Sequence, residues 1–397
     1  MVSRRDFLKQ ATLISLAPTV PAFLAQTARG STPQTDGRIL VVIQLAGGND
    51  GLNMVVPYTN DNYYKLRPKI ALKKDRVHQL TKTAGLNRSM GEAADLFHDG
   101  RLSIVEGVGY PNPNKSHEVS TSIWETARFD PSEHRGYGWI GRALDEAPKP
   151  SHGGPSALLV GSELPPVTLR GRRSVAASLE NIDDLTVRDA ARPHPATSAA
   201  ANESLAAFVR RSTLDTLTTA DRLKQSAKQP AEMADRPASD LAGHLALIAR
   251  LIKSDFGARV YYAVQSGYDT HAFQRDTHDR LLGDLSRALR FFLDDLKRAK
   301  LDDRVLVMTF SEFGRRVDEN ASEGTDHGTA APLLLAGGKL KPGIHGTLPK
   351  LPSAPDVDPV ATTDFRQVYQ EVVTNWLHVP AEKVLDGKFP GLSLVQA

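Results

Sequence analysis

Carboxylate, imidazole and hydroxyl side chains recur just after apolar runs of this sequence. They occur in five places: Asp50, Ser116-His117, Asp269 with His271, Glu312, and Asp326-His327. Oxygen and imidazole ligands of this kind favour Zn, Mn, Mg or Ca. Two such metals could hold the attacking and leaving oxygens of a displacement at a phosphate or sulfate ester. Cysteine is absent, so disulfides, thiolate metal sites and a cysteine nucleophile are excluded.

Two further side chains suit that chemistry. Ser116 stands at a predicted helix start, where it could cap the helix or act as a nucleophile activated by metal coordination. A helix N-terminus also offers backbone N–H groups to an anion, so the two roles are compatible. Arg315 or Arg316 could bind the non-bridging oxygens of a phosphate or sulfate, or form a surface ion pair.

Each motif alone also has a purely structural explanation. The Gly-Gly-Asn-Asp-Gly stretch around Asp50 suits a tight turn, and a single Asp-His pair suits a solvated loop. All five motifs stand next to predicted strands, which makes chance a weak explanation for the whole set. Apolar, β-leaning runs precede or follow them at 37–45, 102–108, 258–264, 305–310 and 332–336, with a further short run at 157–161.

Amphipathic helices are predicted between these runs, at 90–98, 240–255, 281–296 and 364–377. The helix at 281–296 joins two of the predicted strands, which makes a βαβ unit with parallel pairing. The carboxyl ends of parallel strands lie at one edge of a sheet, where α/β proteins bind their ligands. The pattern therefore predicts an α/β domain with the five motifs gathered at that edge.

The 397 residues suffice for one elaborated α/β domain. The formal charge of +3, from 49 basic and 46 acidic residues, indicates neither a nucleic-acid nor a membrane-surface partner. From residue 174 to 236 the chain is rich in Ala, Ser, Thr and charge, which predicts a helical insertion.

The first residues resemble a twin-arginine export signal. Ser3-Arg4-Arg5-Asp6-Phe7-Leu8-Lys9 precedes an apolar run, 11–25, that is broken by Pro18 and Pro21 and is too short for a stable membrane span. The resemblance implies a signal peptide at 1–30, a linker at 31–37 and a domain at 38–397. It also implies the twin-arginine translocase as a partner during export, and a periplasmic or secreted protein.

Five pieces of the sequence together resemble one large family. LAGGNDGLN, NKSHE, YDTH, TFSEFGR and TDHG resemble an uncharacterised family of exported bacterial proteins. That family is grouped with the alkaline phosphatase superfamily, which includes sulfatases and cofactor-independent phosphoglycerate mutases. The resemblance implies an alkaline-phosphatase-like three-layer α/β/α sandwich with a mostly parallel central sheet.

The superfamily pattern also implies site residues. An early Asp ligand matches Asp50, and the expected nucleophile position holds Ser116. A middle Asp and His match Asp269 and His271, although one residue separates them where three are common.

The later part of the pattern, an Asp-His pair and a final His, fits in two ways. By its letters, Asp326-His327 is the pair and His345 the final His. By strand order, Glu312-Phe313 takes the place of the pair and His327 is the final His. We favour the second assignment because the strand at 305–310 runs directly into Glu312. Phe313 cannot ligate a metal, so this assignment departs from a standard two-metal site. It is compatible with a single metal, with Asp326 or His117 as a substitute ligand, or with a binding protein without catalysis.

The sequence thus predicts a hydrolase of phosphate or sulfate esters, acting on a small molecule or glycan and using Zn or Mn, with Ca or Mg as alternatives. The predicted catalytic residues are Ser116 and Arg315, and the predicted metal ligands are Asp50, Asp269, His271, Glu312, Asp326 and His327. The alternative is a non-catalytic periplasmic or cell-surface binding protein that retains the fold.

Overall fold

The computed structural model describes residues 37–130, 132, 136–147, 155–174, 176–180 and 235–396. The predicted signal peptide, almost all of the linker and most of the predicted insertion at 174–236 lie outside these residues. The described residues from Arg38 onward belong to one compact unit.

A nine-stranded sheet forms the centre of this unit, in the order β11-β5-β10-β9-β1-β8-β6-β7, with β12 beside β5. The strands are β1 Ile39–Ala46, β5 Leu102–Gly109, β6 Ala157–Val160, β7 Ala176–Leu179, β8 Val260–Ser266, β9 Val305–Phe310, β10 Ala331–Gly337, β11 Gly343–Gly346 and β12 Thr363–Asp364. Every pairing is parallel except those of β10, which runs antiparallel to β5 and β9. The prediction of a mostly parallel sheet is confirmed.

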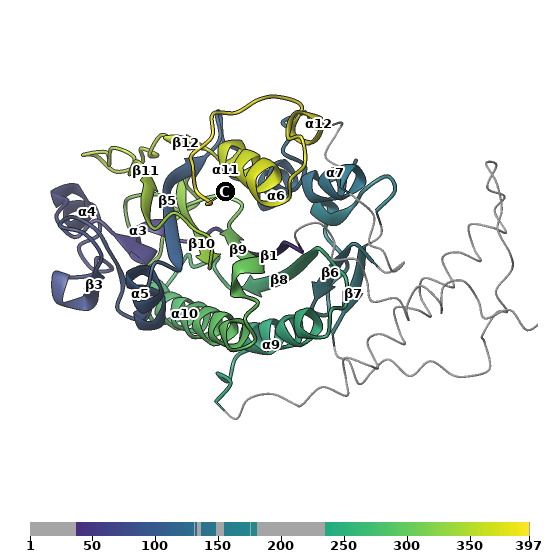
Figure 1. Cartoon of the computed structure of the whole chain (residues 1–397). Coiled ribbons are helices and arrows are strands. Elements are labelled where there is room, and N and C mark those ends of the chain that lie inside the picture. Colours follow the sequence, from purple (N-terminus) through teal and green to yellow (C-terminus); the bar gives the residue numbers. More distant parts are fainter. Residues whose placement is uncertain are drawn as a thin grey trace, which may run out of the picture. The chain divides into compact units, whose positions relative to one another are not determined.

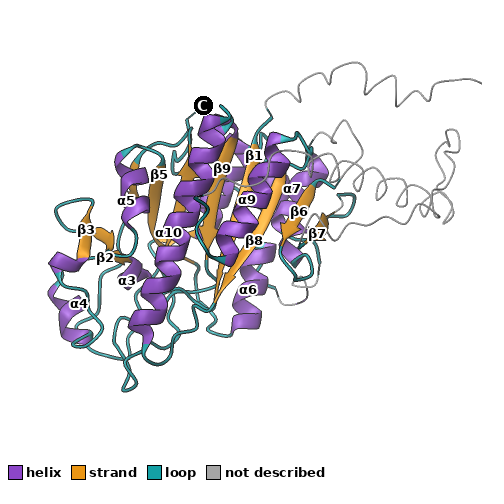
Figure 2. Ribbon diagram, turned by 90° about the horizontal axis from the view of Figure 1, so that it is seen from below, coloured by secondary structure: helices purple, strands orange, loops and turns teal. Residues whose placement is uncertain are grey.

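Helices cover both faces of the sheet (Figures 1 and 2). One face carries α5 Gly91–His98, α9 Asp240–Lys253 and α10 Gln274–Arg298. The other carries α6 His117–Thr126, α7 Trp139–Glu146, α11 Phe365–Glu371 and α12 Glu382–Leu385. Alternation along β1 explains the two layers, because Val41 and Ile43 enter one apolar core while Leu40 and Val42 enter the other. The three-layer α/β/α arrangement is thereby confirmed.

Two of the predicted helices differ from the structure by more than two residues or in helix type. α10 begins seven residues before the predicted start, and its first turns bury Gln274 and His278 rather than apolar side chains. The side chains that these turns bury are polar, so hydrophobic periodicity could not reveal the turns. The last helix changes to a π-helix at Val372–Trp376, and Trp376 Nε1 there donates to the Ile39 carbonyl at 3.0 Å.

A smaller lobe precedes β5 in the chain. It contains α3 Gly51–Met54, α4 Asp61–Leu66 and a three-stranded antiparallel sheet of β2 Val55–Val56, β4 Gly85–Asn87 and β3 Val77–Gln79. Short 3-10 helices lie at Lys74–Arg76, Val167–Leu169 and Asp302–Arg304. A third apolar cluster, including Val56 and Tyr63, joins this lobe to Val317 and Leu351. The sequence pattern left this region unassigned, since its strands are too short to show alternation.

The topology brings the motif-bearing loops together. β1, β5, β8 and β9 point the same way, so their carboxyl ends share one edge of the sheet. β10 runs in the opposite direction, so the residues before its start lie at that same edge. His327, four residues before β10, therefore joins residues that follow the other strands.

Candidate metal centre

The site is built from loops that only glycine allows to approach closely. Gly47, after β1, has φ +121°, and a Cβ there would lie 2.4 Å from the backbone nitrogen of Asp269. Such a contact and such a φ both exclude an ordinary side chain. The β1 loop thus lies against the β8 loop, which carries Asp269 and His271.

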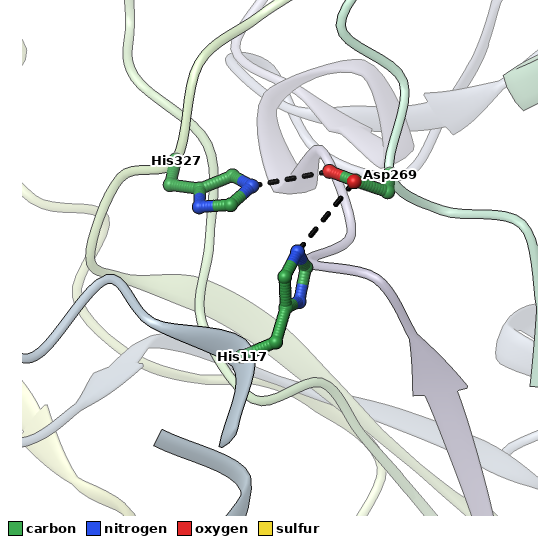
Figure 3. Close-up of side chains that lie close together, drawn as sticks. All are labelled: His117, Asp269 and His327. Carbon is green, nitrogen blue, oxygen red and sulfur yellow. Dashed lines mark hydrogen bonds and ion pairs between the residues drawn. The ribbon is translucent and has the colours of Figure 1, made fainter. Parts of the chain in front are cut away.

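Three imidazoles surround the Asp269 carboxylate, two of which, His117 and His327, are drawn in Figure 3. His327 Nε2 lies 3.1 Å and His271 Nε2 3.0 Å from Asp269 Oδ1, and His117 Nε2 lies 3.5 Å from Asp269 Oδ2. The ligand atoms of His117, Asp269 and His327 all lie within 4.8 Å of one another. The cluster is open to solvent, since Asp269 and His271 are exposed.

The outer nitrogen of each imidazole faces an acceptor. Nδ1 contacts Glu312 Oε1 at 2.8 Å in His117, Asp326 Oδ1 at 3.3 Å in His271 and the backbone oxygen of Lys115 at 2.8 Å in His327. A ring with its proton on Nδ1 donates to the outer oxygen and has a lone pair on Nε2, whereas a ring with its proton on Nε2 donates to the Asp269 carboxylate. Contacts of this type orient histidines that bind metals.

Two of the rings also approach each other. His271 Nε2 and His327 Nε2 lie 3.0 Å apart, which is a hydrogen-bond distance when one of them carries a proton. With both rings protonated on Nδ1, the two lone pairs would instead face a shared cation. Donors around a tetrahedral zinc, at bond lengths of about 2.0–2.1 Å, are separated by roughly 3.3 Å. The contacts of 3.0–3.5 Å are close to this spacing, while the ligand atoms of His117, Asp269 and His327 lie within 4.8 Å of one another, so a metal would draw them closer together.

The Asp269 carboxylate is held ionised. Partial burial raises its pKa, but the Arg315 and His327 hydrogen bonds and the Arg315 charge outweigh this effect and lower the pKa to about 2. Arg315 Nη2 contacts Asp269 Oδ1 at 2.6 Å. The site thus presents an anionic oxygen among imidazole nitrogens, which is a donor set suited to Zn or Mn.

Arg315, predicted from the sequence to bind substrate oxygens, is engaged within the chain. Its side chain is almost fully buried and donates to the carbonyls of Gly47, Gly48, Tyr268 and Thr325 as well as to Asp269. A guanidinium so engaged is not presented to a substrate oxygen. Its position instead indicates that it fixes the loops and the Asp269 carboxylate.

Asp50 also lies apart from the cluster. Its buried carboxylate forms an ion pair with Arg67 at 2.7 Å, accepts from Gln274, and caps α3 through the backbone N–H of Leu52 at 3.3 Å. Burial raises the pKa of Asp50, and the Arg67 charge and hydrogen bond reverse this into a net lowering. This placement does not match the predicted role of Asp50 as a metal ligand, because the Arg67 guanidinium already pairs with its carboxylate.

Glu312 and Phe313 form the floor of the site. Glu312 accepts from the Gly47 N–H at 2.9 Å and contacts Nδ1 of His117. It therefore holds the outer side of the His117 ring and does not face the Nε2 atoms around Asp269. The Phe313 ring lies against the rings of His117 and His327, with centroids 4.9 and 4.5 Å apart. Phe313 therefore packs where the superfamily pattern implies a second ligand.

The remaining predicted residues lie around the cluster. Asp326 orients His271 and also accepts from Asn320, whose hydrogen bond is the main reason for its lowered pKa. Ser116 occupies the N-cap position of α6, but its exposed side chain makes no capping hydrogen bond. His345 lies on β11, where its Nε2 contacts the Lys341 carbonyl. The alternative in which His345 is the final His is not supported by this position.

Arg67 was missing from the sequence prediction, and His117 was predicted only as a possible substitute ligand. The signal for His117 was present, since it follows Ser116 directly in one of the five motifs. Arg67 lies in the lobe without clear periodicity, and nothing in its sequence context marks it as the partner of Asp50.

The family of the chain is established by its sequence. Residues 38–375 match the family described as "Protein of unknown function (DUF1501)", and the chain belongs to that family. No curated protein matches the sequence.

Solved structures with similar folds are remote in sequence. A protein in the alkaline phosphatase superfamily from Vibrio parahaemolyticus is 9% identical, with a TM-score of 0.42 over 96% of this chain and 75% of the other. The zinc complex of the C-terminal periplasmic domain of EcEptC from Escherichia coli is 9% identical, with a TM-score of 0.41 over 76% and 73%. The PsFucS1 sulfatase from Pseudoalteromonas sp. is 9% identical, with a TM-score of 0.40 over 91% and 71%. These values support no argument about activity.

Within the described residues, no helix combines the length and apolar character needed to cross a membrane.

Proposed function

We propose that this protein is an exported, metal-dependent hydrolase of phosphate or sulfate esters. The observation that carries the proposal is the convergence of three histidine Nε2 atoms on the Asp269 carboxylate, with every Nδ1 held by an acceptor. Export through the twin-arginine translocase to the periplasm or beyond rests on the Arg4-Arg5 motif. The substrate is an ester of a small molecule or glycan.

The metal set that we propose differs from the set predicted from the sequence. Asp269, His271 and His327 remain, and His117 joins them. Glu312 and Asp326 act from outside by orienting His117 and His271. Asp50 is left out because its carboxylate forms an ion pair with Arg67, so we propose a single metal per chain. A Zn or Mn ion bound here would polarise the ester oxygen and favour ionisation of a nearby hydroxyl.

Ser116 is the proposed nucleophile. It directly precedes His117, so its Cα lies about 3.8 Å from that of a proposed ligand. Ser116 Oγ forms a bond to phosphorus or sulfur as the bond to the alcohol oxygen breaks. The serine proton reaches the leaving oxygen by way of solvent and gives the alcohol. Water then cleaves the serine ester and releases phosphate or sulfate.

Metal content measured by plasma mass spectrometry tests the site. We expect one Zn or Mn per full-length chain, and loss of that metal in His327→Ala and in Asp269→Asn. The matched control is His345→Ala, which removes a histidine from β11 and should retain the metal. A wild-type protein without metal after purification in zinc- and manganese-supplemented buffer would overturn the proposal.

Activity on 4-nitrophenyl phosphate and 4-nitrophenyl sulfate tests the chemistry. We expect Ser116→Ala to keep its metal and to lose hydrolysis. The alternative function, a binding protein that retains the fold, is favoured by one observation: Phe313 fills a position where the superfamily pattern implies a ligand. Bound metal with no hydrolysis of either ester, and no effect of Ser116→Ala, would select that alternative.

A further inference from the structure

The segment between β11 and β12 contains no helix or strand, and its residues 352–360, named the strap below, are tied to the candidate metal centre. Three side chains from other segments hold the strap: Lys115, whose Nζ lies 2.5 Å from Asp358 Oδ2, Arg316, whose Nη1 pairs with Asp356, and Thr329, whose hydroxyl donates to the Pro359 carbonyl. Two of the three contacts are ion pairs between a base of the site loops and an acid of the strap.

Each of these three anchors lies within two residues of a side chain of the site. Lys115 directly precedes the proposed nucleophile, and its backbone oxygen contacts His327 Nδ1 at 2.8 Å. Arg316 directly follows Arg315, and Thr329 is two residues beyond His327. The strap therefore borders the metal centre, and its two acids hold the bases that adjoin the site.

The strap buries little apolar surface of its own. Residues 353–357 are all exposed, and the Val360 side chain is 81% exposed. Segments with few buried apolar contacts open at a low cost in free energy. The ion pair of Asp356 adds little to stability, since the carboxylate side chain is 78% exposed. An anionic ligand that binds the two bases better than the strap does can therefore displace it.

Both ion pairs leave polar atoms unused. Arg316 Nε and Asp358 Oδ1 are buried and have no hydrogen-bond partner in the described part of the chain. Arg316 contacts Asp356 through Nη1 alone, whereas a guanidinium commonly holds a carboxylate through two parallel N–H···O bonds. Buried polar atoms without partners are rare. Two of them in this one contact indicate that the strap is an incomplete partner for the bases it holds.

We propose that Lys115 and Arg316 bind a further anionic part of the substrate, and that Asp358 and Asp356 occupy this place until the substrate displaces the strap. The two acids are two residues apart, so their Cα atoms are separated by at most about 7 Å and both bases face one short stretch of chain. A phosphate, sulfate or carboxylate substituent offers the acceptors that a guanidinium fork and an ammonium group require. The inference rests on the proposed function, and it restricts the substrate to an ester with a second anionic group.

Isothermal titration calorimetry of the zinc-loaded full-length protein tests this inference. The probes are propane-1,3-diylbisphosphonate and propylphosphonate, whose carbon–phosphorus bonds an ester hydrolase does not cleave. We expect the wild type to bind the bisphosphonate at least tenfold more tightly than propylphosphonate. In Lys115→Met/Arg316→Met that advantage should disappear. Lys297→Met/Arg298→Met removes two exposed positive charges at the end of α10 and is the matched control, which should keep the advantage.

A variant of the strap keeps the test decisive if Lys115→Met/Arg316→Met does not fold. Asp356→Asn/Asp358→Asn removes the competing carboxylates and should bind the bisphosphonate at least threefold more tightly than the wild type does. Unchanged or weaker binding by this variant would overturn the inference. So would equal affinity of the wild type for both probes, or an advantage that survives Lys115→Met/Arg316→Met.

Metal content and hydrolysis of the 4-nitrophenyl esters are measured on the same samples. A failure of the proposed function is then seen separately, because the calorimetric comparison depends on binding and not on turnover. Bisphosphonate binding with the expected response to the variants, in a protein that cleaves neither ester, would support the anion site and contradict the hydrolase.

Discussion

His271 Nε2 and His327 Nε2 lie 3.0 Å apart, and the Nδ1 atom of each ring faces an oxygen acceptor. The two residues are 56 positions apart, on loops at the carboxyl edge of the sheet. In the absence of a metal, one ring can donate a hydrogen bond to the other across this distance. In the proposed metal site both nitrogens would instead bind the same cation.

The outer contact of His117 yields a first prediction. Glu312→Gln keeps the shape of the side chain but removes the negative charge that holds His117 Nδ1. Metal affinity should fall by about 10- to 100-fold, the usual effect of losing such a support. Competition with a chromogenic chelator measures it, with Glu118→Gln as the exposed control. Equal affinity in wild type and Glu312→Gln would show that Glu312 does not support the metal.

The Asp50–Arg67 pair yields a second prediction. Both side chains are almost completely buried, so Asp50→Ala leaves the Arg67 charge without its carboxylate. The free energy of unfolding should fall by about 3–5 kcal/mol, the range for breaking a buried ion pair. Urea unfolding monitored by circular dichroism measures this change.

The double variant Asp50→Leu/Arg67→Met removes both charges and should be less destabilised than Asp50→Ala alone. Folded Asp50→Asn should still bind metal. If Asp50→Asn loses its metal while its stability stays at the wild-type level, Asp50 is a ligand after all, as the sequence predicted.

A buried acid on α6 yields a third prediction, about pH. Burial raises the pKa of Glu125 from 4.5 to about 7, against smaller opposing effects of the Val167 backbone and Arg170. Between these two pH values the folded state binds more protons than the unfolded state, so stability falls as pH rises from about 4.5 to 7. Glu125→Gln removes this loss, which is at most about 3 kcal/mol at 1.36 kcal/mol per pKa unit.

Thermal unfolding of wild type and Glu125→Gln across pH 4–9 measures the effect. The advantage of the variant should be absent near pH 4, grow through pH 5–7 and then level off. An advantage that does not change with pH would attribute the effect to packing instead of ionisation.

Backbone strain next to the metal centre yields a fourth prediction. Phe273 precedes α10 with φ 46° and ψ 42°, a left-handed conformation unfavourable for this residue type, and its side chain is 77% exposed. Phe273→Asn should stabilise the protein by about 1 kcal/mol, because Asn tolerates this conformation. Urea unfolding measures the gain. Phe273→Ala keeps the strain and is the control, so equal stabilisation by Ala and Asn would contradict the explanation.

The sequence by itself determined the layers and the location of the site. Apolar runs such as 305–310 can only be buried strands, and the amphipathic helices between them impose parallel pairing, so the loops after them must meet at one edge. Strand order also placed Glu312 directly after β9 and His327 before β10, as the structure does. These inferences rest on short-range periodicity and chain direction, which are local properties of a sequence.

The tertiary structure alone decided which partner each charged group takes. Asp50 and Asp269 look alike in the sequence, yet one is buried against Arg67 and the other faces three imidazoles. Arg315, predicted to bind substrate, is likewise buried and paired with Asp269. A hydrogen bond forms or fails over differences of about an ångström. Such distances between loops depend on the packing of the whole domain, which no local pattern of residues contains.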